Sequence, residues 1–518
     1  MLVKTYAGAV HGVDAQTITI EVNAGGPAAA DKISYFIVGL PDKAVSEGLL
    51  RKEAAFKNSG LFLPRVKTII NLAPADVRKE GSSFDLPIAI GMLAGAKVIP
   101  PDNLERFFIM GELSLDGSLR PIKGALPIAI QARREGMRGF ILPKVNAREA
   151  AIVSDLEVYG VENLREALAV LSGDPQMQPV YVNAREEFAA NLDNYEVDFS
   201  DVRGQENIKR ALELAAAGGH NVILIGPPGA GKTMLARRLP TILPPLSLHE
   251  ALETTKIHSV AGVLPNNASL VTTRPFRAPH HTISDVALVG GGSNPLPGEI
   301  SISHNGVLFL DELPEFKRTA LEVLRQPMEE RRVTISRAKV SVEYPASFML
   351  VASMNPCPCG YYNHPDKACV CGPGVVQRYV SKISGPLLDR IDLHVEVTPV
   401  SYDELSSSER PKISSSDIRA RVLQAREIQR ERFKDKPELY YNAQMPSKMV
   451  REVCKLDQAG ITLLKTAMER LQLSARAYDR ILKVARTAAD LAGSADIRIE
   501  DLAEAIHYRS LDREGWAG

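Results

Sequence analysis

The 518-residue chain lacks a net charge, because Lys and Arg total 62 and Asp and Glu also total 62. Overall basicity therefore cannot drive binding to nucleic acid, and any such contact has to come from local patches. No run of 18 or more apolar residues occurs, so we expect no membrane span. The first residues contain no apolar core of a secretory signal. We expect a cytoplasmic protein.

Cysteine is also scarce, with five in the chain, and four of them fall within residues 357–371. That clustering favours a metal site in a reducing compartment over a disulfide framework. Hydrophobic residues make up 45% and charged residues 24% of the chain, which excludes disorder along its whole length and a collagen-like class. At about 150 residues per domain, the length predicts roughly three or four domains.

Apolar runs and turn residues divide the chain into three units joined by two polar linkers. Residues 1–172 form the first α/β unit, and the Pro-, Gln- and Asn-rich segment 173–200 is the first predicted linker. Residues 201–400 alternate strands and helices, which predicts a mostly parallel sheet. The serine-rich segment 401–416 is the second predicted linker, and 417–518 is predicted to be helical.

A glycine-rich loop carries the strongest functional signal. It follows the apolar strand predicted at 221–225 and opens a helix, the context that G-x-x-x-x-G-K-[ST] requires. Its backbone N–H groups and the helix N-terminus are expected to hold the phosphates of ATP. Lys232 is expected to reach the β- and γ-phosphates, and the Thr233 hydroxyl to bind Mg²⁺. The predicted nucleotide-binding residues of this loop are Gly226, Pro227, Pro228, Gly229, Ala230, Gly231, Lys232 and Thr233.

Two later strands end in polar residues suited to ATP hydrolysis. The strand 306–311 ends in Asp311, expected to hold Mg²⁺ through water, and Glu312 follows, expected to polarise the attacking water. Asn355 ends a third strand, where its amide can orient that water against the γ-phosphate. Each residue alone fits an ordinary turn, but together with the loop they predict ATP hydrolysis.

Three arginines are candidates to stabilise the charge that develops during hydrolysis. Hydrolysis at a subunit interface needs a cation from the neighbouring chain. Arg390 is the predicted finger in trans, and Arg378 is the second candidate. Arg476 is expected to reach the γ-phosphate in cis from a helical lid. The alternative for each arginine is a surface or structural ion pair.

Longer motifs surround these residues. They are DVRGQ at 201–205, RPFRAPHH at 274–281, PGEI at 297–300, HNGVLFLDELP at 304–314, NPCPCG at 355–360 and LDRID at 388–392. With them the chain resembles the magnesium-chelatase-type branch of AAA+ ATPases and, within it, the ComM/YifB family, over essentially its whole length. The resemblance implies an α/β fold with an AAA+ P-loop αβα core, a C-terminal helical lid and a homo-oligomeric ring, expected to be a hexamer.

The resemblance also implies an activity, since ComM proteins are helicases that drive branch migration during natural transformation. We therefore expect an ATP- and Mg²⁺-dependent motor acting on single-stranded or branched DNA in recombination. One alternative is an AAA+ ATPase that remodels a protein substrate. Insertion of magnesium into a porphyrin is disfavoured, because no porphyrin pocket is visible and the cysteine cluster is an insertion.

The first unit resembles a Lon-protease-like domain of the ribosomal S5 domain 2 type, an α+β fold, through GELSLDGSLRP at 111–121. An active domain of this family uses a Ser–Lys dyad. Ser83 falls at the nucleophile position, but the lysine position falls on Leu126, and Lys123 is three residues away. A serine without a positioned base is a poor nucleophile. A Lon-like ATP-dependent protease is therefore the weaker alternative, and we expect a scaffold or a DNA-facing collar.

The cysteine cluster supplies four thiolates from two short turns: Cys357, Cys359, Cys369 and Cys371. Four soft ligands at tetrahedral reach suit structural Zn²⁺. His364 lies between the pairs and is a possible substitute ligand, and the alternative is free cysteines or one redox-labile pair. Because the cluster follows Asn355, we expect it to couple DNA contact to the nucleotide state. Removing the cysteines is then expected to disturb assembly or DNA coupling more than ATP binding.

Local basic patches are the candidates for DNA contact. The predicted helix 417–436 carries Arg419, Arg426 and Arg430 near one face, which fits either a solvated face or a DNA or subunit contact. Arginines between the P-loop and Asp311 are expected to project into a pore and track phosphates without reading sequence. The residues of this second group are Arg274, Arg277, His280 and His281. A third run, Arg318, Arg325, Arg331, Arg332 and Arg337, follows Glu312 and is not assigned residue by residue.

Overall fold

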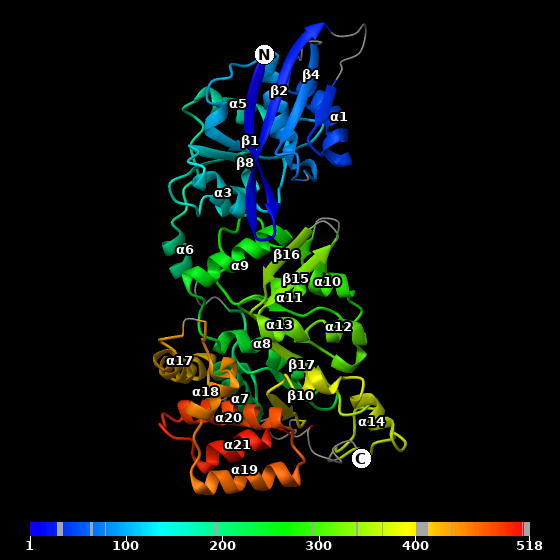
Figure 1. The fold of residues 1–518 in the computed structure, drawn as a ribbon, viewed down its shortest axis with the longest axis vertical. Coiled ribbons are helices and arrows are strands. Elements are labelled where there is room, and N and C mark those ends of the chain that lie inside the picture. The colour runs from blue at the N-terminus through cyan, green and yellow to red at the C-terminus, as the bar shows by residue number, and fades with distance from the viewer. Residues whose placement is uncertain are drawn as a thin grey trace.

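The computed structural model describes residues 1–518 except 28–34, 63–65, 78, 192–194, 293–294, 338–339, 365, 400–412, 437, 510 and 512–518. Three units follow one another along the longest axis, from the N-terminal sheet through the parallel core to the C-terminal helices (Figure 1). The mixed α/β fold with a parallel core and a helical C-terminal part is confirmed.

The N-terminal unit is a seven-stranded mixed sheet, in the order β3-β4-β2-β1-β5-β8-β9, covered by helices. Its strands are β1 (Leu2–His11), β2 (Asp14–Pro27), β3 (Tyr35–Val38), β4 (Val66–Ala73), β5 (Phe107–Ile109), β8 (Gly139–Pro143) and β9 (Glu157–Val161), beside the small pair β6 (Glu112–Leu113) and β7 (Leu119–Arg120). Its helices are α1 (Lys43–Asn58), α2 (Asp85–Gly95), α3 (Ala125–Arg134), α4 (Lys144–Ala150), α5 (Leu164–Ser172) and α6 (Ala184–Ala190), with short turns at Ser82–Phe84 and Leu104–Arg106.

The core unit is built on a five-stranded parallel sheet in the order β11-β14-β17-β10-β18. The sheet strands are β10 (Val222–Ile225), β11 (Phe276–Arg277), β14 (Val307–Leu310), β17 (Met349–Met354) and β18 (Leu393–Glu396). Two hairpins join β12 (Gly290–Gly291) to β13 (Leu296–Pro297) and β15 (Arg332–Arg337) to β16 (Val340–Pro345). The helices are α7 (Glu206–Gly218), α8 (Lys232–Ile242), α9 (Leu248–Ala261), α10 (Asp285–Val289), α11 (Glu299–Ile302), α12 (Arg318–Glu322), α13 (Arg325–Glu330), α14 (Val375–Val380) and α15 (Gly385–Leu388).

Alternate residues of the core strands point to opposite faces of the sheet, as a strand requires. Val222 and Leu224 of β10 join the apolar cluster formed with α7, α8 and the C-terminal helices. Ile223 and Ile225 join a second cluster formed with the β15–β16 hairpin and α12. Because both faces of the sheet are covered at β10, all four of its residues are buried and the strand is a continuous apolar run.

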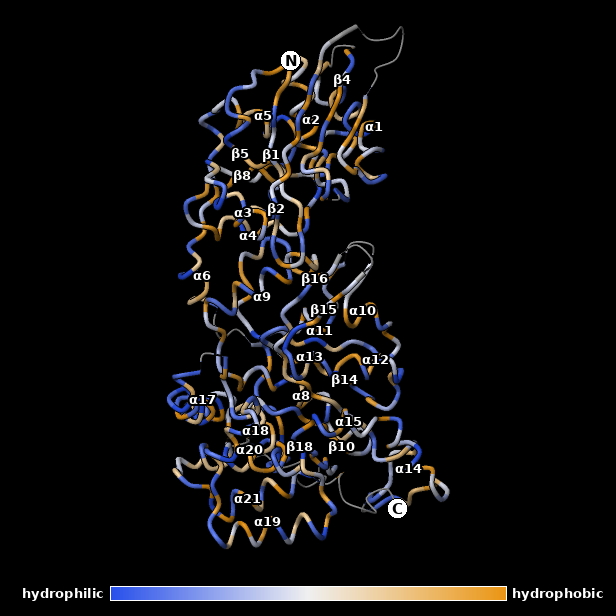
Figure 2. Tube along the Cα trace, viewed as in Figure 1, coloured by the Kyte–Doolittle hydropathy of each residue, from blue (hydrophilic) through white to orange (hydrophobic). Residues whose placement is uncertain are grey.

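The C-terminal unit consists of helices packed on α7 and α8. They are α17 (Ser415–Arg432), α18 (Ser447–Val453), α19 (Gln458–Arg470), α20 (Ala475–Leu491) and α21 (Ile499–His507), with a short turn at Asn442–Gln444. A capping box of Ser414 and Asp417 starts α17, two residues before the predicted start. Figure 2 shows that α17 is largely hydrophilic along its length, and its interior face contributes Ile418, Val422 and Ala425 to the core.

The N-terminal unit is docked on α9 of the core unit. Ala251 of α9 belongs to the N-terminal apolar cluster. The backbone N–H of Gly124, just before α3, donates to the Ser259 carbonyl at 3.0 Å, and Lys256 pairs with Asp14 at 2.7 Å. This contact fixes the first unit against the second through apolar packing and hydrogen bonds.

Of the two predicted linkers, the first is not a loose connection. Val180 pairs with Val158 of β9, and Phe188 of α6 packs on the N-terminal core. The polar composition of this segment predicted a loose linker, but a few apolar side chains suffice to anchor it to the N-terminal unit. The second predicted linker, 401–416, lies outside the described residues up to 412.

Candidate functional site

The carboxyl ends of three parallel strands bring the predicted nucleotide residues to one edge of the core sheet. β10 leads into the loop at Gly226, β14 into Asp311 and β17 into Asn355. Because β10, β14 and β17 are adjacent and parallel, their carboxyl ends share that edge. Residues separated by more than a hundred positions in the chain therefore converge.

The glycine-rich loop has the backbone that its sequence predicts. Gly229 and Gly231 adopt positive φ angles of 78° and 84°, a conformation that a side chain would strain. α8 then begins at Lys232, so its free N–H groups face the loop. A helix N-terminus preceded by such a loop forms a cradle for an anion.

Lys232 is held inside this cradle. Its Nζ donates to the Gly226 and Pro227 carbonyls at 2.7 and 2.9 Å, and to Asn355 Oδ1 at 3.2 Å. Burial lowers the pKa of the ammonium group, while Asp311 and Glu312 act in the opposite direction. The contact with Asn355 directly joins the loop to the end of β17.

Asp311 is oriented by two hydroxyl groups. Thr233 Oγ1 donates to Asp311 Oδ2 at 2.8 Å, and Ser353 donates to Asp311 Oδ1. A hydroxyl and a carboxylate that face each other across the loop are oxygen ligands of the kind Mg²⁺ prefers. Sequence reasoning missed Ser353, although a serine inside the buried strand β17 is a signal that could have identified it.

Glu312 lies just beyond the strand in the left-handed region, with a φ of 54°. Its backbone N–H donates to Asp311 Oδ1 at 3.0 Å, and its carboxylate lies 3.4 Å from His281 Nδ1. The sequence places His281 among the candidates for DNA contact, and the structure places it beside the predicted catalytic carboxylate. The histidine is thus a further residue of the site that sequence reasoning did not assign there.

A cavity of about 500 Å³ adjoins these residues. Its lining includes Glu312, Asn355, Pro358 and Arg378. Arg378, the second candidate for a finger in trans, therefore lies beside the hydrolytic residues of its own chain. Of the three candidates to stabilise the developing charge, Arg378, Arg390 and Arg476, it is the one that lines this cavity.

Arg390 and Arg476 lie at the opposite, amino edge of the same sheet. Arg390 precedes β18, is 12% exposed and pairs through Nη2 with Glu329 at 2.6 Å. Arg476, 68% exposed, pairs with Asp389 at 3.1 Å. The partner of Arg476 precedes β18 whereas the P-loop follows β10, so this structure does not bring Arg476 to the P-loop of its own chain. The role of Arg476 at the γ-phosphate in cis stays a prediction. The role of Arg390 in trans stays a prediction.

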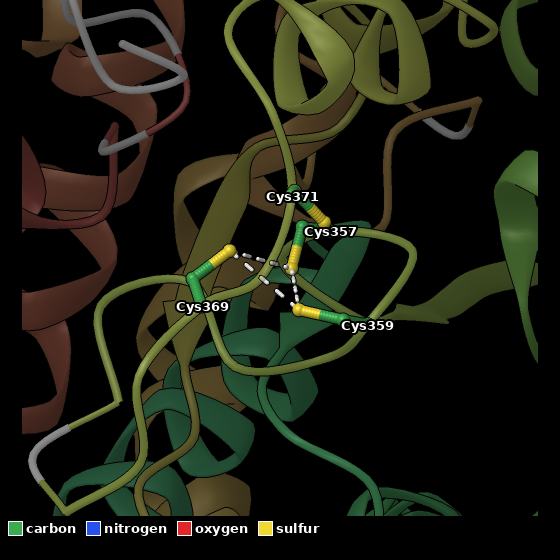
Figure 3. A group of neighbouring side chains, drawn as sticks. All are labelled: Cys357, Cys359, Cys369 and Cys371. Carbon is green, nitrogen blue, oxygen red and sulfur yellow. Dashed lines mark hydrogen bonds between the residues drawn. The ribbon is translucent and has the colours of Figure 1, made fainter.

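The four clustered cysteines point toward one another (Figure 3). Cys357 Sγ lies 3.3 Å from Cys359 Sγ and 3.8 Å from Cys369 Sγ, and all four Sγ atoms lie within 4.8 Å of one another. Tetrahedral thiolates around Zn²⁺ are separated by about 3.8 Å, given a Zn–S bond of about 2.3 Å. Backbone N–H donation from Tyr361 lowers the pKa of Cys359 to about 6. The donor set fits a soft divalent metal.

His364 is not part of this ligand set. Its Nδ1 accepts from the backbone N–H groups of Asp366 and Lys367 at 3.0 and 3.1 Å. The cluster touches the P-loop instead, since a Cβ on Gly360 would meet the Pro228 ring at 2.6 Å. The turn that carries Cys357 and Cys359 therefore packs directly on the nucleotide loop.

The N-terminal unit does not assemble a Ser–Lys dyad from the predicted positions. Ser83 lies in the turn before α2, and its carbonyl accepts from the Gly111 N–H at 2.8 Å. Leu126 is fully buried in α3. The Lys123 side chain lies against Gly262 of the core unit, where an added Cβ would meet its Cε at 2.7 Å. The nearest lysine in sequence thus serves the contact between the two units.

The predicted pore arginines are engaged within the chain. Arg274 donates to the Pro244 and Asn305 carbonyls, and Arg277 forms a two-point pair with Glu299 at 2.7 and 2.8 Å. Neither is free to track phosphates in this arrangement. Of the α17 arginines, Arg430 is exposed, whereas Arg426 turns inward.

Three family models match the chain: "Magnesium chelatase, subunit ChlI" over residues 198–405, "Subunit ChlI of Mg-chelatase" over 21–146, and "Magnesium chelatase, subunit ChlI C-terminal" over 412–509. Among the described residues, no helix combines the length and apolar character needed to cross a lipid bilayer.

Similarity to individual proteins extends over the whole chain. The competence protein ComM of Haemophilus influenzae is 43% identical over 515 residues, which cover 99% of this chain and 98% of that protein. The YifB proteins of Salmonella typhimurium and Escherichia coli are 42% and 43% identical over 516 and 510 residues, covering 99% and 98% of this chain and 98% and 96% of those proteins.

Proposed function

The chain belongs to the ComM/YifB family of magnesium-chelatase-like AAA+ proteins, and from this membership we propose that it is an ATP-driven motor that moves branched or single-stranded DNA. The observation that carries the proposal is the convergence of Lys232, Thr233, Asp311 and Asn355 at one sheet edge. In this proposal the loop binds ATP, and Thr233 and Asp311 hold Mg²⁺, which neutralises phosphate charge when it is bound.

Glu312 then polarises the attacking water, and Asn355 orients it. Glu312 is suited to this step because its carboxylate lies beside the cavity that also reaches Asn355. His281, 3.4 Å from the carboxylate, positions it. The Asn355 amide accepts from Lys232 at 3.2 Å, so the residue senses the same phosphate that the lysine binds.

A homo-oligomeric ring, with a hexamer as the expected size, is part of the proposal. Arg390 and Arg476 lie at the sheet edge opposite their own P-loop. In a ring, such an edge faces the nucleotide of the next subunit, and an arginine there stabilises transition-state charge in trans. The present partners of Arg390 and Arg476, Glu329 and Asp389, would be exchanged for phosphate oxygens in that state.

DNA as the substrate is supported by the name of the Haemophilus relative, a competence protein. Branch migration in recombination or transformation is the finer activity that we propose. The second candidate, remodelling of a protein, uses the same nucleotide residues and differs only in its substrate. Proteolysis is disfavoured, since Leu126 occupies the lysine position and is fully buried.

We also propose that the four clustered cysteines bind structural Zn²⁺. All four Sγ atoms lie within 4.8 Å of one another, as a tetrahedral site requires. Thiolates persist in a reducing compartment, so a cytoplasmic location belongs to the same proposal. Metal analysis of the purified protein is expected to find one zinc per chain, and loss of that zinc in Cys369→Ser. Cys454→Ser, which changes a buried cysteine outside the cluster, is the matched control.

The test of the motor function is ATP hydrolysis by the purified protein with and without DNA. Single-stranded DNA, duplex DNA and a Holliday junction are compared at two salt concentrations, because phosphate contacts weaken as salt rises. We expect stimulation by single-stranded or branched DNA, and its loss in Lys232→Ala. A second assay then measures branch migration of a labelled Holliday junction.

Hydrolysis that is indifferent to every DNA, together with no DNA binding at low salt, would refute the DNA motor. That result would favour the protein-remodelling candidate. Absence of all hydrolysis in the wild-type protein, with ATP binding also absent, would refute the assignment of the nucleotide site itself.

A further inference from the structure

A cavity of about 240 Å³ opens between the amino edge of the core sheet and the C-terminal helices. One wall consists of residues just before four strands: Asn221 before β10, Gly306 before β14, Phe348 before β17 and Asp392 before β18. The other wall comes from α17, α20 and the turn around Tyr441. The P-loop residues are not among its lining residues, so this cavity is distinct from the nucleotide site.

The cavity has more cations than carboxylates. Its charged lining residues are Arg274, Arg331, Arg426, Arg480, Lys483, Glu329 and Asp392. Both carboxylates are already paired, because Asp392 lies 2.8 Å from Arg480 and Glu329 lies 2.6 Å from Arg390. Arg274 is held by backbone carbonyls and lies 3.4 Å from Glu250. The remaining cations of the lining are Arg331, Arg426 and Lys483.

Arg331, Arg426 and Lys483 have no carboxylate partner in the part of the chain that the structure describes. Arg331 Nη1 donates to the Glu438 carbonyl at 3.1 Å. Lys483 Nζ donates to the Ala443 carbonyl at 3.0 Å. Backbone carbonyls carry only partial charge, so neither of these two cations is neutralised by a direct ion pair.

Arg426 is the most exceptional of the three. Its guanidinium carbon lies over the Tyr441 ring, 4.1 Å from the ring centre, which is a cation–π contact. Its Nη1 is buried and has no hydrogen-bond partner among the described residues. Burial lowers the pKa of Arg426 to about 10. A buried N–H donor on a cation is costly when unpaired, and such a donor is ready to bind an anion.

We propose that this cavity binds an oxyanion of the phosphate class, held by Arg331, Arg426 and Lys483. Guanidinium groups match phosphate oxygens with parallel N–H donors, and an ammonium group adds a point charge. The volume of about 240 Å³ is below the roughly 300–1,000 Å³ of sites for drug-sized ligands. The ligand is therefore small: inorganic phosphate, pyrophosphate or the phosphate end of a nucleotide.

The test measures pyrophosphate binding to the full-length Lys232→Ala protein by calorimetry and by thermal shift. The lysine change weakens the P-loop site, so that binding at the second cavity is seen without ATP turnover. Arg426→Gln and Lys483→Met are each added to this background. Arg430→Gln is the matched control, because Arg430 lies one turn later on α17 and its side chain is 78% exposed.

We expect pyrophosphate to bind the Lys232→Ala protein and raise its melting temperature. Arg426→Gln is expected to weaken that binding by about tenfold or more, the worth of a lost charged hydrogen bond, and Lys483→Met to weaken it less. Arg430→Gln should leave it unchanged. The proposal is overturned if the Lys232→Ala protein does not bind pyrophosphate, or if neither Arg426→Gln nor Lys483→Met changes its affinity.

Competition separates the two sources of phosphate. If ADP displaces pyrophosphate from the Lys232→Ala protein and Arg426→Gln weakens both, the ligand is the phosphate end of a nucleotide. If inorganic phosphate competes and ADP does not, the ligand is a free oxyanion. Because the measurement requires neither hydrolysis nor DNA, its failure is distinguishable from failure of the proposed motor function.

Discussion

The two edges of the core sheet are built from the same strands and carry opposite kinds of chemistry. At the carboxyl edge, Lys232 is surrounded by carbonyl and amide oxygens and by the nearby carboxylates Asp311 and Glu312. At the amino edge, Arg426 and Lys483 face a cavity without a carboxylate of their own. At the carboxyl edge charge is compensated within the chain, whereas at the amino edge Arg331, Arg426 and Lys483 have no carboxylate partner among the described residues.

Whether an arginine precedes or follows a strand decides whether it can reach the P-loop of its own chain. In a parallel sheet all strands run the same way, and a four-residue strand such as β10 spans about 13 Å. A side chain at the amino edge is therefore separated from its own P-loop by the length of the strands. In the ring that we propose, assembly with a second chain brings the two edges together.

The largest expected effect is at the carboxyl edge. Lys232→Ala is expected to reduce ATP hydrolysis to background, because the loop then loses ATP affinity as well as a positioned cation on the transferred phosphate. Steady-state phosphate release measures it. Lys465→Ala, which removes a lysine exposed on α19, is the control and should keep wild-type activity.

The second largest effect is expected when the proposed contact between Arg390 and the P-loop of the neighbouring chain is removed. Arg390→Ala is expected to lower hydrolysis by about 10³-fold, the typical worth of an arginine finger. Mixing the Arg390→Ala and Lys232→Ala proteins should restore part of the activity, because some interfaces then combine an intact P-loop with an intact arginine.

The mixture decides between action in trans and in cis. If Arg390 served its own P-loop, no mixed ring would contain a complete site and activity would stay at the level of the separate variants. The same mixing with Arg476→Ala tests that residue. Arg451→Ala, an exposed arginine on α18, should behave as wild type.

A smaller effect is expected at the carboxyl edge, where the cysteine cluster packs on the nucleotide loop. Because Gly360 packs on Pro228, we expect Cys369→Ser, through loss of zinc, to raise the KM for ATP several-fold. This differs from the expectation formed on the sequence, in which ATP binding was the less affected property. Metal content and ATP affinity are measured on the same samples. Unchanged ATP affinity in a zinc-free protein would show that the contact between the two loops has no energetic role.

The smallest effect concerns pH at the amino edge. Burial and neighbouring Arg480 lower the pKa of Lys483 from 10.5 to about 8, against the opposite influence of Asp392, Asp479 and Cys454. Lys483 is thus protonated below pH 8 and loses its charge as pH rises through 8. Pyrophosphate affinity is expected to fall severalfold between pH 7 and pH 9. Lys483→Met should remove most of that dependence, and an equal dependence in the variant would contradict it.

The stability of the folded chain depends on the protonation of Lys483 in the opposite direction: protonation favours pyrophosphate binding but disfavours folding. The unfolded chain binds more protons than the folded chain between about pH 8 and pH 10.5. The contribution of Lys483 to stability is therefore present above pH 10.5 and is lost as pH falls through 8. A bound oxyanion opposes this loss, because it favours the charged lysine.

Much of the fold and of the nucleotide site was predictable, because the signals are local. The apolar run before Gly226, the glycine spacing and Lys232 are contiguous in the chain, and so are the strand and acids at Asp311. The first linker was less predictable, since its anchoring depends on Val180 meeting β9. Ser353 and His281 were missed, because their roles depend on which strand or loop lies opposite.

The sequence by itself determined the P-loop, the acids that follow β14 and the four thiolates, because each lies within a short segment whose backbone geometry its own residues set. Only the tertiary structure decided which edge of the sheet each arginine occupies. It also decided that Arg426 turns onto Tyr441 and that Gly360 meets Pro228. Those relations join segments far apart in the chain, and they exist only after the sheet and the helices have packed.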